Sequence, residues 1–145
     1  MTKSAAETEN KNLTRQTYNA FVKNLRIEDI RLASAMIKNL DCSYMPSSAE
    51  VRWTMAAKYE NQHGKIEVLN RYNVRIAEKG KELKAKLSVI FCVTYNSKIP
   101  MTDELFEEFK DRNLPLNTWP YFREFLHNAV LRMGWPPFIA PTYVS

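Results

Sequence analysis

Three long runs of alternating apolar and polar residues fill the middle of the chain. The apolar phase occupies the odd positions of Val51–Glu60, the even positions of residues 66–76, and the odd positions of Leu83–Tyr95. Successive side chains of a strand point to opposite faces, so each run predicts a strand with one face on a core and one in water. Short turns containing glycine separate the runs, which predicts an antiparallel sheet.

A fourth strand is predicted ahead of these three. Leu25 and Ile27 alternate, and then Ile30 and Leu32 continue on a shifted phase. A phase shift inside an extended run is typical of a β-bulge, here near Asp29.

The first part of the chain is polar and rich in charges and amides. We interpret residues 1–16 as a flexible N-terminal lead and residues 17–145 as a single domain, with a strand-like pattern from Tyr18 onward. Residues 34–49 are predicted to form a long connection, and loops of this length are usually functional or folded on themselves. The apolar residues in this connection are Met36, Ile37, Leu40, Tyr44 and Met45.

Two helices are predicted after the strands. Pro100 and Thr102 open a short one, and Asn117 or Thr118 is expected to cap a longer one. Pro120 suits the first turn of that longer helix, and Gly134 suits the position after its last turn. Its core-facing stripe at helical spacing comprises Trp119, Phe122, Leu126, Val130 and Met133, with Ala129 beside it.

Tyr121, Phe125 and Leu131 lie off this stripe. They are either scattered exposed apolar residues or a second face buried against another subunit or a bound chain. Strands followed by helices predict an α+β domain in which a four-stranded antiparallel sheet carries its helices on one face.

Composition narrows the class of protein. The 145 residues are 45% hydrophobic, as in folded globular proteins. The N-terminus lacks the apolar segment of a signal peptide, and no window is apolar enough to span a bilayer, so we expect a cytoplasmic protein.

Cys42 and Cys92 are too few for a disulfide scaffold or zinc site. Since no catalytic or phosphate-binding motif is present, we expect no enzymatic activity, no cofactor and no metal.

The net charge is +5, and much of it falls on the predicted water-facing side of the sheet. This side is either a solvated charged surface or a binding surface for an acidic protein or a phosphate backbone. It lacks aromatic residues for base stacking, except for tyrosines at strand ends. The outward positions are Arg52, Lys58, Arg71, Arg75, Lys84 and Lys86, against Glu60 and Glu67.

Two separate segments carry a family resemblance. The first holds Asp-Ile in the first strand, and the second holds Pro-Tyr-x-Arg-Glu followed by Arg-x-Gly-aromatic-Pro-Pro. Together they resemble the SecB-like chaperones, including those associated with toxin–antitoxin systems, and we expect their shared residues to be structural. These residues are Asp29, Ile30, Pro120, Tyr121, Arg123, Glu124, Gly134, Pro136 and Pro137.

The resemblance implies a cytoplasmic chaperone that works without nucleotide or metal and assembles as a homotetramer, a dimer of dimers. Such proteins hold unfolded or extended polypeptides in apolar grooves, either secretory precursors in protein export and transport or antitoxins. The alternative function is a basic module that binds nucleic acid or an acidic protein and uses the same fold without chaperone activity. The residues expected to contact a client are Leu40, Tyr44, Met45, Trp135, Phe138 and Ile139. They are equally compatible with packing of the fold or of a subunit interface.

Two departures from the family pattern affect these expectations. Export chaperones of this family dock the SecA motor through carboxylates, whereas the sheet surface here is net basic, which argues against SecA as a partner. The chain also ends at Ser145, so we expect the second long C-terminal helix of the family to be absent. A chaperone of specialised clients, such as an antitoxin, is therefore favoured over a general export chaperone.

Overall fold

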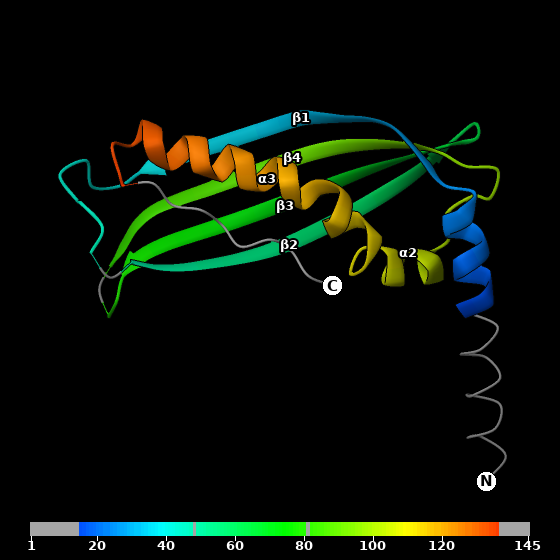
Figure 1. Cartoon of the computed structure of the whole chain (residues 1–145), viewed down its shortest axis with the longest axis horizontal. Coiled ribbons are helices and arrows are strands. Elements are labelled where there is room, and N and C mark those ends of the chain that lie inside the picture. Colours follow the sequence, from blue (N-terminus) through cyan, green and yellow to red (C-terminus); the bar gives the residue numbers. More distant parts are fainter. Residues whose placement is uncertain (1–14, 48, 81, 137–145) are drawn as a thin grey trace, which may run out of the picture.

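The computed structural model describes residues 15–47, 49–80 and 82–136, which form one antiparallel sheet with helices on one side (Figure 1). The strands stand in the order β1-β4-β3-β2. This arrangement confirms the predicted α+β fold. The labelled elements are β1 (Arg26–Asn39), β2 (Ala49–Gln62), β3 (Lys65–Glu78), β4 (Leu83–Asn96), α2 (Asp103–Phe109) and α3 (Asn113–Arg132).

Tight turns set the register of the sheet. His63 and Gly64 both have positive φ angles, 47° and 77°, and they join β2 to β3 as a two-residue hairpin turn. Such turns match the twist of the strands that they connect.

Because β1 pairs with β4 and not with β2, the connection after Asn39 has to cross the width of the sheet.

β1 contains two irregularities in its pairing with β4. The first lies between Ile27 and Asp29, which confirms the bulge predicted near Asp29. The second lies between Leu32 and Ser34 and shifts the alternation again. The strand therefore continues to Asn39, and our prediction that the connection begins at Ser34 was wrong. A bulge adds one unpaired residue, and this broke the period-2 pattern on which the prediction relied.

The N-terminal segment corrects another prediction. Residues 15–23 are helical, whereas we predicted a lead up to residue 16 and strand-like structure from Tyr18. Tyr18, Phe21 and Leu25 have the 3–4 spacing of a helix face, and Tyr18 and Phe21 are buried. The ring of Phe21 meets that of Phe109 of α2 edge-on at 6.3 Å. Residues 1–14 lie outside the described part of the chain.

α3 begins earlier than predicted. It starts at Asn113, so Asn117 and Thr118 lie inside the helix and neither is its N-cap. Pro115 falls in the first turn, where its missing N–H is tolerated, whereas Pro120 lies in the interior. The predicted start of the short helix is confirmed, because Thr102 is its N-cap and the Thr102 side chain accepts the Leu105 amide at 3.2 Å.

The C-terminal end of α3 agrees with the prediction. Gly134 has φ of 78°, and its amide donates to the Leu131 carbonyl at 3.0 Å. The Trp135 amide donates to the Val130 carbonyl at 3.2 Å. This pair of bonds is the Schellman motif, in which a left-handed glycine ends the helix and turns the chain back.

The main core lies between α3 and the two central strands. The predicted stripe of α3 is buried from Trp119 to Val130, and Phe122 stacks on Tyr72 of β3 with 4.3 Å between ring centres. Burial alternates along β3 and β4, but no described residue of β1 or β2 is fully buried. A helix is about 10 Å wide and strands lie about 4.8 Å apart, so one helix covers about two strands.

A polar network crosses this core at the one position that interrupts the apolar phase of β3. Asn70 is fully buried, and its side-chain oxygen accepts from the Thr118 hydroxyl at 2.6 Å. The Tyr72 hydroxyl lies 2.7 Å from the same Thr118 oxygen. Asn70 therefore fixes the position of α3 on the sheet, since buried polar groups are costly unless they are bonded.

We predict that Thr118→Val will destabilise the fold more than Thr118→Ser. Valine removes the hydroxyl that donates to the buried Asn70 oxygen, and a buried group left without a partner costs about 1–3 kcal/mol. Serine keeps the hydroxyl and loses only a methyl group, which costs about 0.8 kcal/mol. Urea unfolding of the two variants measures the difference, and equal stability would contradict the role given to the network.

Candidate functional site

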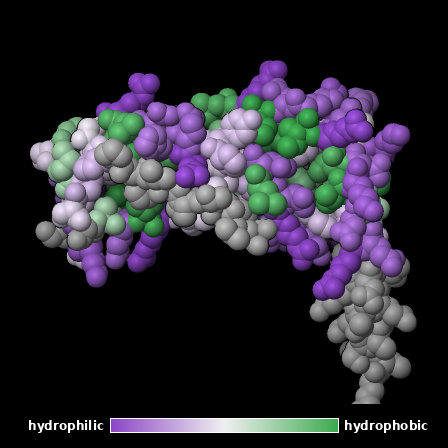
Figure 2. Space-filling view, viewed as in Figure 1, coloured by the Kyte–Doolittle hydropathy of each residue, from purple (hydrophilic) through white to green (hydrophobic). Residues whose placement is uncertain are grey.

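Apolar side chains remain exposed along the parts of the sheet that α3 leaves open. Most of them lie on β1, on the connection after it and on β2, and the rest lie on α3. Figure 2 shows apolar groups reaching the surface where α3 runs beside β1. The exposed large apolar residues of the described chain are Ile27, Leu32, Met36, Ile37, Leu40, Met45, Trp53, Leu116, Tyr121 and Leu131.

Three of these residues form a line along β1, which we call the β1 strip: Ile27, Leu32 and Ile37. Each pairs in register with a buried, core-facing residue of β4, so all three lie on the helix side of the sheet. Leu32 is opposite Phe91, whose ring contacts that of Tyr121 on α3 at 6.4 Å. The β1 strip therefore runs beside an exposed aromatic residue of the helix, in the position expected of a second apolar face.

A second apolar feature lies where the β1–β2 connection meets the end of α3. The rings of Tyr44 and Trp135 meet edge-on at 5.7 Å. Next to them is a small cavity of about 150 Å³, which we call the loop pocket. It is lined by Pro46, Ser47, Ala49, Val51, Ile76, Val130, Trp135 and Pro136.

Polar contacts hold the connection in place over this pocket. The hydroxyl of Tyr44 donates to Glu78, and the ammonium of Lys84 lies 5.2 Å from the centre of the Tyr44 ring. Asp41 accepts from the Ser43 hydroxyl at 2.6 Å and from Lys84 at 3.3 Å. These bonds, that from Ser43 first, lower the pKa of Asp41 below its ordinary value. Lys84 is thus engaged with the connection and is not part of a free basic surface.

The structure separates the predicted client contacts into two groups. Leu40 and Met45 are exposed, at 49% and 58%. Tyr44 is half-buried and Trp135 is buried at 6%, and both pack against the main core. Phe138 and Ile139 lie outside the described residues.

The residues of the family motif take several positions. Ile30 is half-buried and packs against the main core and against a second buried cluster that contains Phe21 and Phe109. Asp29 forms an ion pair with Arg31 on the surface. Pro120 lies inside α3, so our interpretation that it sets the start of the helix was wrong.

The remaining motif residues divide between a helix surface and the loop pocket. Tyr121 and Glu124 are exposed and Arg123 is half-buried. A shallow hollow of about 330 Å³ is lined by Pro120, Arg123, Glu124 and His127. Gly134 ends α3, Pro136 lines the loop pocket, and Pro137 is outside the described chain.

Sequence reasoning missed Trp53 as a surface residue. It lies on the core-facing side of β2, yet it is 43% exposed. Its ring packs on Trp119 at 4.8 Å and on Tyr72 at 6.2 Å. The alternating pattern of β2 predicted correctly that Trp53 lies on the core-facing side. The exposure of Trp53 follows from the position of β2 at the edge of the sheet, which the pattern does not reveal.

Among residues 15–47, 49–80 and 82–136, the ionisable groups with shifted pKa values are three tyrosines, Asp41 and Cys92. No three His, Cys, Asp or Glu residues gather as a metal site in these ranges. Burial raises the pKa of Tyr18 to about 12, and a hydrogen bond to Asp103 raises that of Tyr59. Both tyrosines support the packing around α2.

None of the helices described is both long and apolar enough to cross a bilayer.

Comparison with solved structures reveals an extensive similarity to a SecB-like chaperone. The SecB-like chaperone Rv1957 of Mycobacterium tuberculosis, solved in complex with a ChAD peptide from the HigA1 antitoxin Rv1956, superposes with a TM-score of 0.75. The match covers 86% of this chain and 94% of that chain, at 14% sequence identity. The chain has the SecB-like fold. The resemblance seen in the sequence is thereby confirmed at the level of the fold.

A second structure supports the same architecture more weakly. A protein of unknown function from Streptococcus agalactiae matches with a TM-score of 0.52 and 8% identity, over 81% of this chain and 97% of that chain. No protein-family model and no curated protein matched the sequence.

We predict that Asp41→Asn will loosen the β1–β2 connection. The pKa of Asp41 is lowered in the folded protein, so its ionised form contributes stability above the unfolded pKa. This contribution is lost as the pH falls through the folded pKa. Urea unfolding should therefore show the parent more stable at neutral pH, with the difference shrinking in acid. Glu60→Gln, at an exposed carboxylate of β2, is the control, and a difference independent of pH would contradict the assignment.

Proposed function

We propose that this protein is an ATP-independent holdase that binds extended segments of non-native polypeptides through apolar contacts. The observation that carries the proposal is the exposure of Leu40 and Met45 on the β1–β2 connection beside the loop pocket, in a chain with the SecB-like fold. Contiguous exposed apolar surface marks an interaction site. The proposal includes no catalytic step, cofactor or metal.

The client site that we propose is centred on the connection between β1 and β2. Leu40 and Met45 offer flexible, exposed apolar groups, and methionine adapts to clients of different shape. Tyr44 and Trp135 form the rigid part of the proposed site, because each packs against the main core. Pro137, Phe138 and Ile139 follow Pro136 in the chain, so we include Phe138 and Ile139 in the proposed site.

Two arguments favour an antitoxin over a secretory precursor as the client. The structural neighbour from Mycobacterium tuberculosis was solved with a peptide of an antitoxin, which makes an antitoxin segment a suitable first client to test. The basic outer surface of the sheet is also unsuited to a basic contact on the SecA motor, because like charges repel. A cytoplasmic location would suit either client and is part of the proposal.

The β1 strip suits self-association. β1 is an edge strand of 14 residues, and its helix side is apolar and uncovered. Long, exposed edge strands pair readily with other chains. We propose that a second copy covers this strip, and that a dimer of such dimers forms the homotetramer expected from the resemblance.

The nucleic-acid alternative receives less support. Affinity for a phosphate backbone needs basic groups, which are present, but single strands are also held by stacking on aromatic rings. On the outer side of the described sheet the strands present no aromatic side chain. We therefore place the holdase first.

We predict that Leu40→Ser with Met45→Ser will reduce holdase activity several-fold, because the variant loses two exposed apolar contacts and no core packing. The measurement is light scattering of an aggregating unfolded protein, at increasing ratios of this protein and without nucleotide. Leu116→Ser with Leu131→Ser is the matched control, since these residues of α3 are 46% and 42% exposed. Equal activity of parent and Leu40/Met45 variant would show that the client site is elsewhere.

We also predict that Leu32→Glu with Ile37→Glu will lower the oligomeric state. Buried charges without partners are costly, so an interface over the β1 strip should not tolerate them. Sedimentation velocity measures the change. Met36→Glu is the control, because Met36 is 43% exposed on the opposite side of the same strand. If the double variant sediments like the parent, the strip is not the interface.

A further inference from the structure

The outer side of the sheet, away from α3, carries an unusual line of charges. Strand register places Lys38 opposite Lys86, Lys86 opposite Arg75, and Arg75 opposite Arg52. Four basic side chains, one from each strand, therefore form a single row across the whole sheet, which we call the cation row. Adjacent strands lie about 4.8 Å apart, so the row spans about 14 Å.

This row is not neutralised within the described chain. Arg52 lies 3.9 Å from Glu50, a long contact with a guanidinium side chain that is 84% exposed. Within the described ranges Lys38, Lys86 and Arg75 form no ion pair. Like charges directly opposite each other destabilise a sheet, so the cation row costs folding free energy that an anionic partner would recover.

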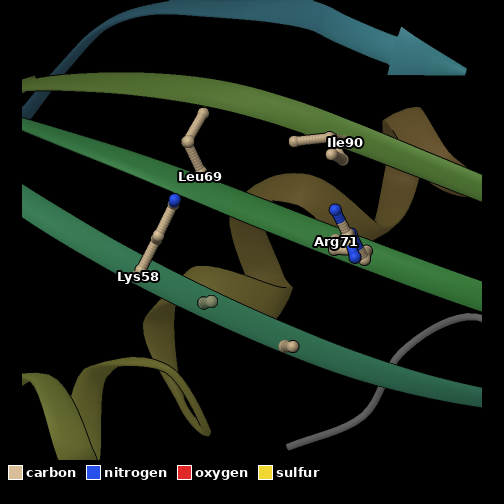
Figure 3. Close-up of a pocket in the computed structure, with 6 residues that line it drawn as sticks. Lys58, Leu69, Arg71 and Ile90 are labelled. Carbon is tan, nitrogen blue, oxygen red and sulfur yellow. The ribbon is translucent and has the colours of Figure 1, made fainter.

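An apolar hollow lies next to the row on the same side. Its volume is about 300 Å³, and Figure 3 shows Leu69 and Ile90 beside the basic side chains of Lys58 and Arg71. Ile90 is four residues along β4 from Lys86, which is about 13 Å. The residues that line the hollow are Ala56, Ala57, Lys58, Leu69, Arg71 and Ile90.

We infer that this side of the sheet is a docking surface for an acidic, extended polypeptide segment. A segment that lies along the central strands would place carboxylates over the middle of the cation row, at Lys86 and Arg75. One bulky apolar side chain about four residues away would then enter the hollow, since an extended chain rises about 3.3 Å per residue. Charge complementarity is the argument for this occupant. The surface lies across the sheet from the loop pocket and does not depend on the proposed holdase activity.

A second copy of this chain fits the surface less well. Three carboxylates of the outer side lie near the opposite end of the strands, where Asp29, Glu67 and Glu60 share one register row with Thr94, and a fourth, Glu50, lies beside Arg52. Asp29 is already paired with Arg31. The remaining carboxylates Glu67, Glu60 and Glu50 are fewer than the four cations of the row, and Lys58 and Arg71 add two basic groups further along the same side. Nucleic acid is disfavoured because the hollow is lined by aliphatic and not aromatic groups.

Fluorescence anisotropy with the full-length protein tests the proposal. The probe is a labelled synthetic peptide with consecutive glutamates and one leucine about four residues beyond them, the separation set by the rise of an extended strand. We expect binding that weakens as salt is raised, because exposed charge pairs are screened. Replacing the glutamates by glutamine should abolish binding, and replacing the leucine by serine should weaken it.

Charge reversal locates the site. Arg75→Glu with Lys86→Glu should weaken peptide binding by about tenfold or more, because two central ion pairs become repulsive. Lys23→Glu with Lys98→Glu changes the net charge equally at the other end of the sheet and should have little effect. The Leu40→Ser/Met45→Ser variant should bind the peptide like the parent, which separates this surface from the client site.

Several results would overturn the proposal. These are absence of peptide binding, equal binding of the glutamine peptide, and equal losses in the two charge-reversal variants. Tighter binding of single-stranded oligothymidylate than of the acidic peptide would assign the surface to nucleic acid instead. A change of oligomeric state in Arg75→Glu/Lys86→Glu, seen by sedimentation, would make the row part of a self-interface.

Discussion

The whole structure depends on the fact that one long helix covers a sheet twice its width. α3 packs its apolar stripe on β3 and β4, and the bonds among Asn70, Tyr72 and Thr118 fix it there. A helix about 10 Å wide cannot also cover strands about 4.8 Å apart on either side. The helix sides of β1 and β2 are therefore left partly open, although their sequences are apolar. These open apolar surfaces give a physical reason why a chain of this fold would bind a partner, either another copy or a client.

The two sides of the sheet offer different chemistry. The helix side presents aliphatic and aromatic groups, where binding would rest on apolar burial and tolerate salt. The outer side presents the cation row and the hollow beside it, where binding would depend on charge and weaken with salt. A holdase that also carries a docking surface for an acidic segment would keep the two kinds of partner apart, because the sheet itself separates the two surfaces.

Much of the fold could be predicted because alternation in the three central runs is nearly unbroken. The face of α3 that packs on the sheet followed from its stripe at Trp119, Phe122 and Leu126. The errors occurred where local patterns were ambiguous: the second bulge of β1 hid its last residues, and the short helix containing Tyr18 was mistaken for a strand. At the candidate site, Trp135 and Met45 looked equivalent in sequence, yet one is buried and the other exposed. Such differences arise from contacts between distant segments, here Trp135 with Tyr44, which no local pattern encodes.

Photo-crosslinking from single positions tests the central claim most directly. A photoreactive phenylalanine analogue would replace Met45 in one variant and Leu116 in another, both exposed in the parent. Each variant is illuminated with an unfolded polypeptide and without nucleotide. Our account predicts strong crosslinking to the client from position 45 and little from position 116. Equal yields from the two positions, or none from position 45 in a folded protein, would contradict a client site at the β1–β2 connection.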